Sequence, residues 1–179
     1  MVEAPPRDAA LPSYDLLLSE KNVKPNERHI NQTAGLIEQT LAEFGIPSQV
    51  VGYQVGPTIT QFAVEPGYVN KGESEDARSK VRVSQISGLQ RDLALALSAK
   101  RLRIQAPVPG RSFVGIEVPN KQSSVVRMRP ILESGVFHAL NSPLGIALGR
   151  DVSGQPVVAD LARMPHLLIA GTTGSGKSI

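Results

Sequence analysis

The sequence predicts an α+β domain, with helices on one face of a mostly antiparallel sheet, followed by the incomplete start of an α/β phosphate-loop domain. The order helix, strand, strand is expected twice between residues 26 and 118. Such an αββαββ order is typical of an α+β fold. Near the carboxyl end, the apolar run 167–170 leads directly into a glycine-rich stretch, and a strand that runs into such a loop is typical of a parallel α/β sheet.

The chain opens with a proline-rich segment, residues 1–11, which we expect to be a semi-rigid linker. The first helix is expected over residues 26–44, because Asn26 is a favourable N-cap residue and Gly45 with Pro47 ends the helical pattern. Its apolar residues recur at steps of three and four and predict a core-facing stripe, which consists of Ile30, Ala34, Ile37, Leu41 and Phe44.

Two strands are expected over residues 49–55 and 58–65, where β-branched and aromatic residues are enriched on both sides of a Gly-Pro turn. Residues 65–80 show no periodicity and predict a loop, with a short strand over 80–84. The second helix is expected over 87–99, where Ser87 and Gln90 have the spacing of a capping box. Alternation over 101–106 and the stretch 113–118 predict two more strands, joined by a turn at 107–111.

The character of the sequence changes after Asn120, and we therefore expect one domain over residues 12–119 and the start of another over residues 120–179. Residues 130–140 predict a short helix. The stretches 144–148 and 155–159 predict a hairpin that turns through residues 150–154.

The composition excludes several classes of protein. The chain has no cysteine, which excludes disulfide frameworks and thiolate metal sites, and its three histidines are scattered. No apolar run approaches the length of a membrane span, and the region after Met1 lacks the core of a signal peptide. We therefore expect this chain to be cytoplasmic and to make no membrane contact of its own. Only 4% of its residues are aromatic, so the core should be largely aliphatic.

The formal net charge is +3, and the cations concentrate between residues 78 and 111. A nucleic-acid partner is one explanation, and a solvated face or a subunit contact is the other. The residues concerned are Arg78, Lys80, Arg82, Arg91, Lys100, Arg101, Arg103 and Arg111.

Residues 171–178 fit the phosphate-loop pattern of a glycine, four free positions and Gly-Lys-Ser. In such a loop, backbone N–H groups surround a phosphate, so glycines are needed where side chains would block its approach. Lys177 is expected to contact the β- and γ-phosphates, and the Ser178 hydroxyl a Mg²⁺ ion. The predicted nucleotide-binding residues are Gly171, Thr172, Thr173, Gly174, Ser175, Gly176, Lys177 and Ser178.

A complete catalytic site is not expected within this chain. The acidic metal-binding residue, the water-orienting residue and any arginine finger of such a site would all follow Ile179. We therefore expect the chain to be the front portion of a larger protein and to lack ATPase activity when isolated.

Four stretches of the sequence strongly resemble the FtsK/SpoIIIE family of bacterial DNA translocases. The resemblance covers nearly the whole chain after Leu11, and the block from Met164 onward is its most specific part. The stretches that carry it are Pro107-Val108-Pro109-Gly110-Arg111, the strand end 115–120, Leu148-Gly149-Arg150-Asp151 with Gly154, and residues 164–178.

The resemblance implies a hexameric ring that encircles double-stranded DNA and moves it with ATP and Mg²⁺ during chromosome segregation, cell division or sporulation. Residues 12–119 would be the family's α domain, and residues 120–179 the start of its RecA-like β domain. The full-length protein would be anchored at the membrane by a segment that this chain does not contain.

Two alternatives remain open from the residues. One is a different phosphate-loop protein, such as a small GTPase, although such switches place the loop near the start of their domain. The other is a non-catalytic oligomerisation or scaffold module of the ring. Lys and Arg without an aromatic stacking platform suit contact with duplex phosphates better than single-strand binding.

Overall fold

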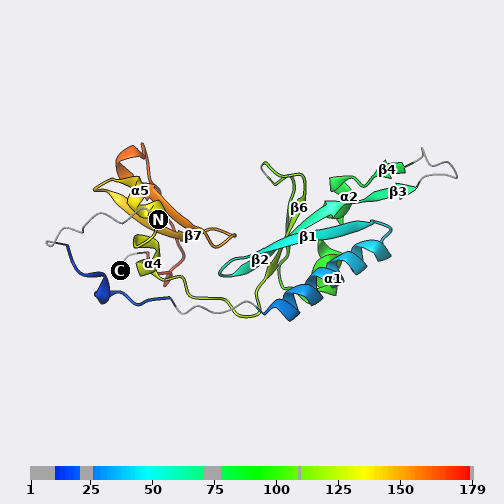
Figure 1. Cartoon of the computed structure of the whole chain (residues 1–179), viewed down its shortest axis with the longest axis horizontal. Helices are drawn as coiled ribbons and strands as arrows, with labels where there is room; N and C mark the ends of the chain where they lie inside the picture. The colour runs from blue at the N-terminus through cyan, green and yellow to red at the C-terminus, as the bar shows by residue number, and fades with distance from the viewer. Residues whose placement is uncertain (1–10, 21–25, 71–77, 109, 178–179) are drawn as a thin grey trace. The chain divides into compact units, whose positions relative to one another are not determined.

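The computed structural model describes residues 11–20, 26–70, 78–108 and 110–177 (Figure 1). These residues form two compact units. The larger unit consists of Glu20–Val126 and Arg150–Gln155. The smaller unit consists of Arg127–Gly149 and Pro156–Ile179 with Met1–Ser19, as far as these ranges are described. Most of the predicted linker, residues 1–10, lies outside the described residues.

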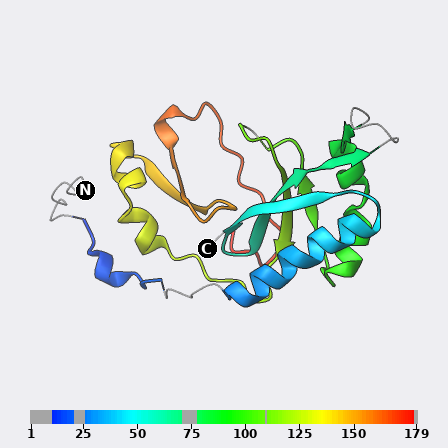
Figure 2. The same cartoon turned by 45° about the vertical axis from the view of Figure 1, so that its right-hand side comes forward.

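A four-stranded antiparallel sheet and three helices make up most of the larger unit (Figure 2). The strand order is β1 (Ser48–Val55), β2 (Ile59–Pro66), β6 (Val114–Pro119) and β5 (Arg103–Gln105). The long helix α1 (Glu27–Glu43) contacts both β1 and α3 (Gln90–Ala96). This arrangement confirms the predicted α+β fold.

Helix α1 begins and ends close to its predicted limits because its capping groups are local. The Asn26 side chain accepts a hydrogen bond from the N–H group of His29 at 3.2 Å, which satisfies one of the free donors of the first turn. At the other end, Phe44 is the C-cap residue and is 53% exposed. Its assignment to the core was therefore wrong, because the helical stripe ends one turn earlier at Leu41.

The core lies between α1, α2, α3 and one face of the sheet, and it is almost entirely aliphatic, as predicted. Alternate residues of β2 and β6 point into it, since successive side chains of a strand face opposite sides. Phe62 is the one aromatic residue among the described buried hydrophobic residues of this core, which are Ile30, Ile37, Leu41, Ile46, Phe62, Val64, Val81, Ile86, Leu93, Leu102, Val114, Ile116 and Val118.

The helix predicted over residues 87–99 is instead two short helices, α2 (Val83–Gly88) and α3. They meet at Leu89, whose N–H group bonds to carbonyl groups at the end of α2. The predicted capping box is also wrong, because the Gln90 side chain donates to the Leu102 carbonyl at 2.6 Å. The helix start is capped by Gln85, whose side chain accepts from the N–H group of Arg82 at 2.8 Å.

A second small hairpin replaces the loop predicted over residues 65–80. Strand β3 (Tyr68–Asn70) pairs with β4 (Arg78–Lys80), and residues 71–77 between them lie outside the described part. The strand predicted over 80–84 is therefore shifted towards the amino end, and α2 begins where that strand was expected to continue.

The smaller unit contains short elements only. The 3-10 helix Tyr14–Leu16 lies near its start, and the helices α4 (Met128–Leu132) and α5 (Gly135–Leu140) occupy the region where one helix was predicted. Ser134 separates them by capping α5, because its hydroxyl accepts from the N–H group of Phe137. The predicted hairpin is confirmed as β7 (Gly145–Arg150) and β8 (Pro156–Asp160), followed by a 3-10 helix at Leu161–Arg163.

The tip of the β7–β8 hairpin, residues 150–155, belongs to the larger unit. The Arg150 guanidinium donates to the Glu20 carboxylate at 2.6 Å and to the Gly154 carbonyl at 2.8 Å. The β1–β2 turn lies so close to this tip that a Cβ atom on Gly56 would be 2.4 Å from the carbonyl oxygen of Val152. The β1–β2 turn and the hairpin tip can therefore approach this closely only because Gly56 has no side chain.

Among the described helices, none combines the length and the apolar character needed to cross a membrane.

Candidate functional site

The predicted phosphate loop forms a tight bend in the smaller unit. Gly174 and Gly176 have φ angles of +81° and +85°, a region that residues with a side chain rarely adopt. The carbonyl of Thr172 accepts a hydrogen bond from the N–H group of Ser175 at 3.1 Å. Gly174 and Gly176 therefore occupy positions where the backbone conformation favours a residue without a side chain.

The loop has free donors that suit a phosphate. Among the described residues, the N–H groups of Gly174, Gly176 and Lys177 donate to no other group, and all three residues are exposed. A Cβ atom on Gly171 would lie 2.4 Å from Ser175 Oγ, so a side chain at this position would displace the Ser175 hydroxyl. Successive free N–H groups in a bend form a concave site for anions, and the donors present therefore fit a phosphate group.

The metal-binding part of the prediction falls outside the described residues, because Ser178 is not among them. Within the described part of the chain, no three His, Cys, Asp or Glu side chains gather in a way that could hold a metal ion.

The strand predicted over residues 167–170 is absent from the structure. Leu167, Leu168 and Ile169 are 51%, 90% and 70% exposed and have no strand partner among the described residues. A strand is stable only when neighbouring strands satisfy its backbone groups, so this apolar run lies uncovered beside the phosphate loop.

The predicted basic cluster lies entirely in the larger unit, and all eight of its side chains are exposed. None of them forms an ion pair with a described carboxylate, since the ion pairs found involve only Arg129, Arg150 and Arg163. The cluster extends from β4 to the connection before β6. These cations are therefore available to an acidic partner.

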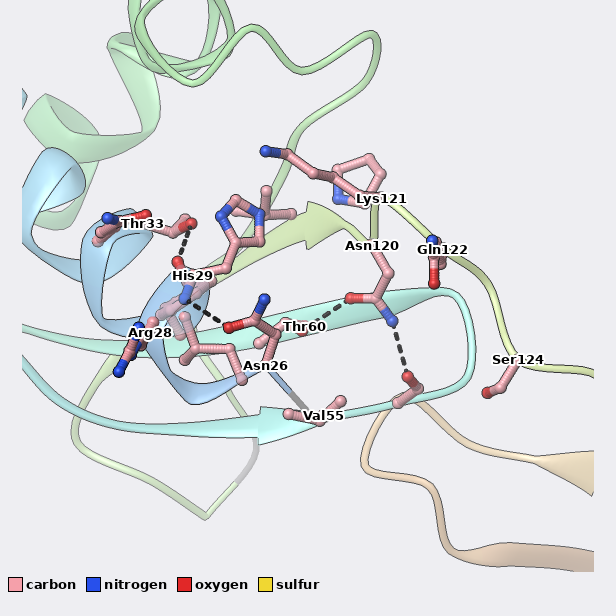
Figure 3. A pocket seen from close by; sticks show the side chains of 16 residues that line it. Asn26, Arg28, His29, Thr33, Val55, Thr60, Asn120, Lys121, Gln122 and Ser124 are labelled. Atoms are coloured by element: carbon pink, nitrogen blue, oxygen red, sulfur yellow. Dashed lines mark hydrogen bonds between the residues drawn. The ribbon is translucent and has the colours of Figure 1, made fainter. Parts of the chain in front are cut away.

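Sequence reasoning missed a cavity of about 530 Å³ in the larger unit, where α1 begins and where β1, β2 and β6 have their ends (Figure 3). The residue that shapes it is Asn120. Its side chain accepts a hydrogen bond from the Thr60 hydroxyl at 2.7 Å and donates to the Gly56 carbonyl at 2.9 Å. The sequence indicated only a strand end and a domain boundary at Asn120, because its hydrogen-bond partners are 60 and 64 residues away in the sequence.

Sequence reasoning also gave no role to Asp151 in the hairpin tip. Its carboxylate accepts hydrogen bonds from the Ser153 hydroxyl at 2.7 Å, the Ser153 N–H group at 2.9 Å and the Gln155 N–H group at 2.8 Å. The hydrogen bond from the Ser153 hydroxyl, followed by those from backbone N–H groups, holds the pKa of this carboxyl below its usual value. A carboxylate at this position therefore organises the turn.

An α+β domain joined to a glycine-rich bend with phosphate-loop sequence and free backbone donors defines a class: an α+β domain followed by a segment that resembles the start of a phosphate-loop domain. Comparison with known families makes this class specific. The FtsK alpha domain family matches residues 11–120, and the FtsK/SpoIIIE family matches residues 127–179. The chain belongs to the FtsK/SpoIIIE family, and its larger match is to that family's alpha domain.

Individual relatives agree with this assignment. The chain is 45% identical over 176 residues to the DNA translocase FtsK of Campylobacter jejuni. The aligned residues make up 97% of this chain and 17% of that protein. It is 41% identical over 175 residues to FtsK of Clostridium tetani, covering 96% of this chain and 22% of the relative. It is 40% identical over 188 residues to the DNA translocase SpoIIIE of Bacillus subtilis, covering 99% of this chain and 22% of the relative. The chain thus spans about a fifth of the length of these relatives.

Proposed function

We propose that the chain is part of an ATP-driven translocase of double-stranded DNA that acts in chromosome segregation and cell division. Two observations together support this proposal: the chain matches the two families, and its loop has glycines and free N–H groups that suit a phosphate. Residues 12–119 would be the α domain, and residues 120–179 the start of the RecA-like ATPase domain.

The proposed nucleotide site is the loop from Gly171 to Ser178. Its backbone N–H groups would hold the β-phosphate, and the Lys177 ammonium would add a positive charge beside the β- and γ-phosphates. Ser178 would offer its hydroxyl to Mg²⁺, which neutralises charge on the phosphates when bound. The remaining catalytic groups would come from a part of the protein that follows this chain, so the 179-residue chain should not hydrolyse ATP.

The proposed partner is the phosphate backbone of duplex DNA. A motor that moves along any sequence must contact a feature that repeats uniformly, and only the backbone does so. The eight exposed cations between Arg78 and Arg111, which have no described acidic partner, are candidates for this contact. The working assembly would be a homo-oligomeric ring, which is a hexamer by resemblance, and membrane anchoring would come from a segment outside this chain.

The test is DNA-stimulated ATP hydrolysis by the full-length protein. We expect hydrolysis that prefers ATP over GTP and rises when linear duplex DNA is added. Replacement of Lys177 by alanine should abolish it, whereas Arg163→Ala, which removes a cation with an 84% exposed side chain outside both the loop and the basic cluster, should retain it. Preference for GTP would indicate a switch protein instead. Absence of hydrolysis in an assembled ring would favour the scaffold alternative.

A further inference from the structure

The cavity at the start of α1 is lined by buried apolar residues and by cationic residues, of which Figure 3 labels Arg28 and Lys121. We call the first group its apolar floor and the second its cationic rim. The floor is formed by Ile30, Phe62 and Val118, which are at most 9% exposed. The rim carries Arg28, His29 and Lys121. A cavity of about 530 Å³ falls within the usual size range of ligand pockets, so it has room for a few side chains of a partner.

The polar groups deep in the cavity are already satisfied. Thr33 donates to the His29 carbonyl at 2.8 Å, and Thr60 donates to Asn120 at 2.7 Å. By contrast, the side chains of Arg28, His29 and Lys121 form no hydrogen bond or ion pair with another described residue. None of the described residues that line the cavity is an aspartate or a glutamate. An occupant should therefore combine apolar side chains with negative charge.

The chain itself contains a segment of this chemistry, the Tyr14–Leu18 segment. Leu16 and Leu18 are 78% and 67% exposed, and the Asp15 side chain is 84% exposed. From residue 11 to residue 20, the sequence carries two acidic residues and no basic one. Exposed leucines beside an acidic group complement a cavity with an apolar floor and a cationic rim.

The segment is held within the smaller unit of its own chain. Asp15 forms an ion pair with Arg129 at 3.2 Å, and the N–H group of Leu17 donates to the Tyr14 carbonyl. Leu16 and Leu18 are nevertheless exposed, so they are not part of the core of their own unit. The Asp15 carboxylate of this ion pair is 84% exposed, and ion pairs screened by solvent contribute little to stability, so exchanging Arg129 for the rim cations costs little.

We propose that the Tyr14–Leu18 segment of one copy docks into the α1 cavity of a second copy, with Leu16 and Leu18 on the floor and Asp15 facing Lys121. Each copy carries one segment in its smaller unit and one cavity in its larger unit, made of different residues, so the contact joins copies head to tail. Repeated contacts of this kind generate a ring if the rotation closes. The inference rests on the self-assembly part of the proposed function and names an interface for it.

The experiment measures peptide binding and self-association of the 179-residue chain. A fluorescent peptide with the sequence of residues 11–20 is titrated with the chain, and anisotropy reports binding. We expect saturable binding that weakens by about tenfold with Lys121→Glu, since one charge contact of about 1.4 kcal/mol corresponds to that factor. Lys100→Glu makes the same charge change at an exposed lysine outside the cavity and should leave the affinity unchanged.

The second arm is sedimentation velocity of the chain at increasing concentration. We expect concentration-dependent association that is lost in the double variant Leu16→Ser and Leu18→Ser, both of which replace exposed side chains and should leave the fold intact. Absence of saturable peptide binding, or binding that ignores Lys121→Glu, overturns the proposal. Association that survives the double variant also overturns it. Either result leaves DNA-stimulated ATP hydrolysis, the test of the proposed function, unaffected.

Discussion

Replacement of Gly56 by alanine should detach the β7–β8 hairpin tip from the β1–β2 turn. The added methyl group would lie 2.4 Å from the carbonyl oxygen and 3.0 Å from the carbonyl carbon of Val152. Both atoms are backbone atoms, so no side-chain rotation relieves the clash. Either the turn or the tip must move.

The expected cost follows from the groups that this movement disturbs. Overpacking of a close contact costs about 1–3 kcal/mol. The Gly56 carbonyl accepts from the Asn120 amide at 2.9 Å, and its N–H group donates to the Ile59 carbonyl at 2.8 Å. Each such hydrogen bond contributes about 1 kcal/mol. We therefore expect a loss of about 2 kcal/mol, which corresponds to about 10 °C in the midpoint of thermal unfolding for a domain of about 100 residues.

Circular dichroism during heating measures the midpoint, and hydrogen exchange locates the change. The N–H groups of Asp151 and Gly154 bond within the tip at 2.9 and 3.0 Å, and they should exchange faster in the variant. Gly52→Ala is the matched control, because a Cβ atom there would meet nothing within 4 Å. Equal midpoints for Gly56→Ala and Gly52→Ala, with unchanged exchange at the tip, would refute the reasoning.

Three further outcomes are expected. The pKa of Asp151 is lowered in the folded chain, so its contribution to stability is present above its unfolded pKa and is lost as the pH falls through its folded pKa. In Asp151→Asn, the free energy of unfolding, measured with urea at a series of acidic pH values, should therefore fall less steeply with decreasing pH than in the unmodified chain. Asn120→Ala removes two hydrogen bonds and should cost about 2 kcal/mol of unfolding free energy, whereas Gln122→Ala at an exposed neighbour should cost nothing measurable in the same urea titration. The isolated 179-residue chain should release no phosphate from ATP in a coupled assay, and measurable turnover that is absent from Lys177→Ala would show that its catalytic groups lie within it.

The elements predicted well are those whose causes are local in the sequence. Helix α1 follows from its 3.6-residue periodicity and from Asn26, which caps the N–H group of a residue three positions away. The bend at residues 172–176 follows from glycines whose conformations are a property of a few consecutive residues, and its role as a phosphate loop stays a prediction. The resemblance added the family, which the comparisons confirm.

The features missed depend on contacts between distant residues. Strands β3 and β4 have three residues each, too few for a period to show. The break at Leu89 is accompanied by a hydrogen bond from Gln90 to Leu102, twelve residues away. The α1 cavity combines residues from 26–33, 55–62 and 118–124, and its central amide, Asn120, bonds to partners 60 and 64 residues earlier. No local pattern carries such information.

Displacement of a third strand from a DNA triplex by the full-length protein tests the central claim most directly, because a moving motor removes that strand and a static ring does not. Release of the strand that requires hydrolysable ATP, and that disappears with Lys177→Ala while the protein still binds duplex DNA, is the result we predict. Unchanged release by the Lys177→Ala protein, or no release by the unmodified protein in the presence of ATP, would contradict the account.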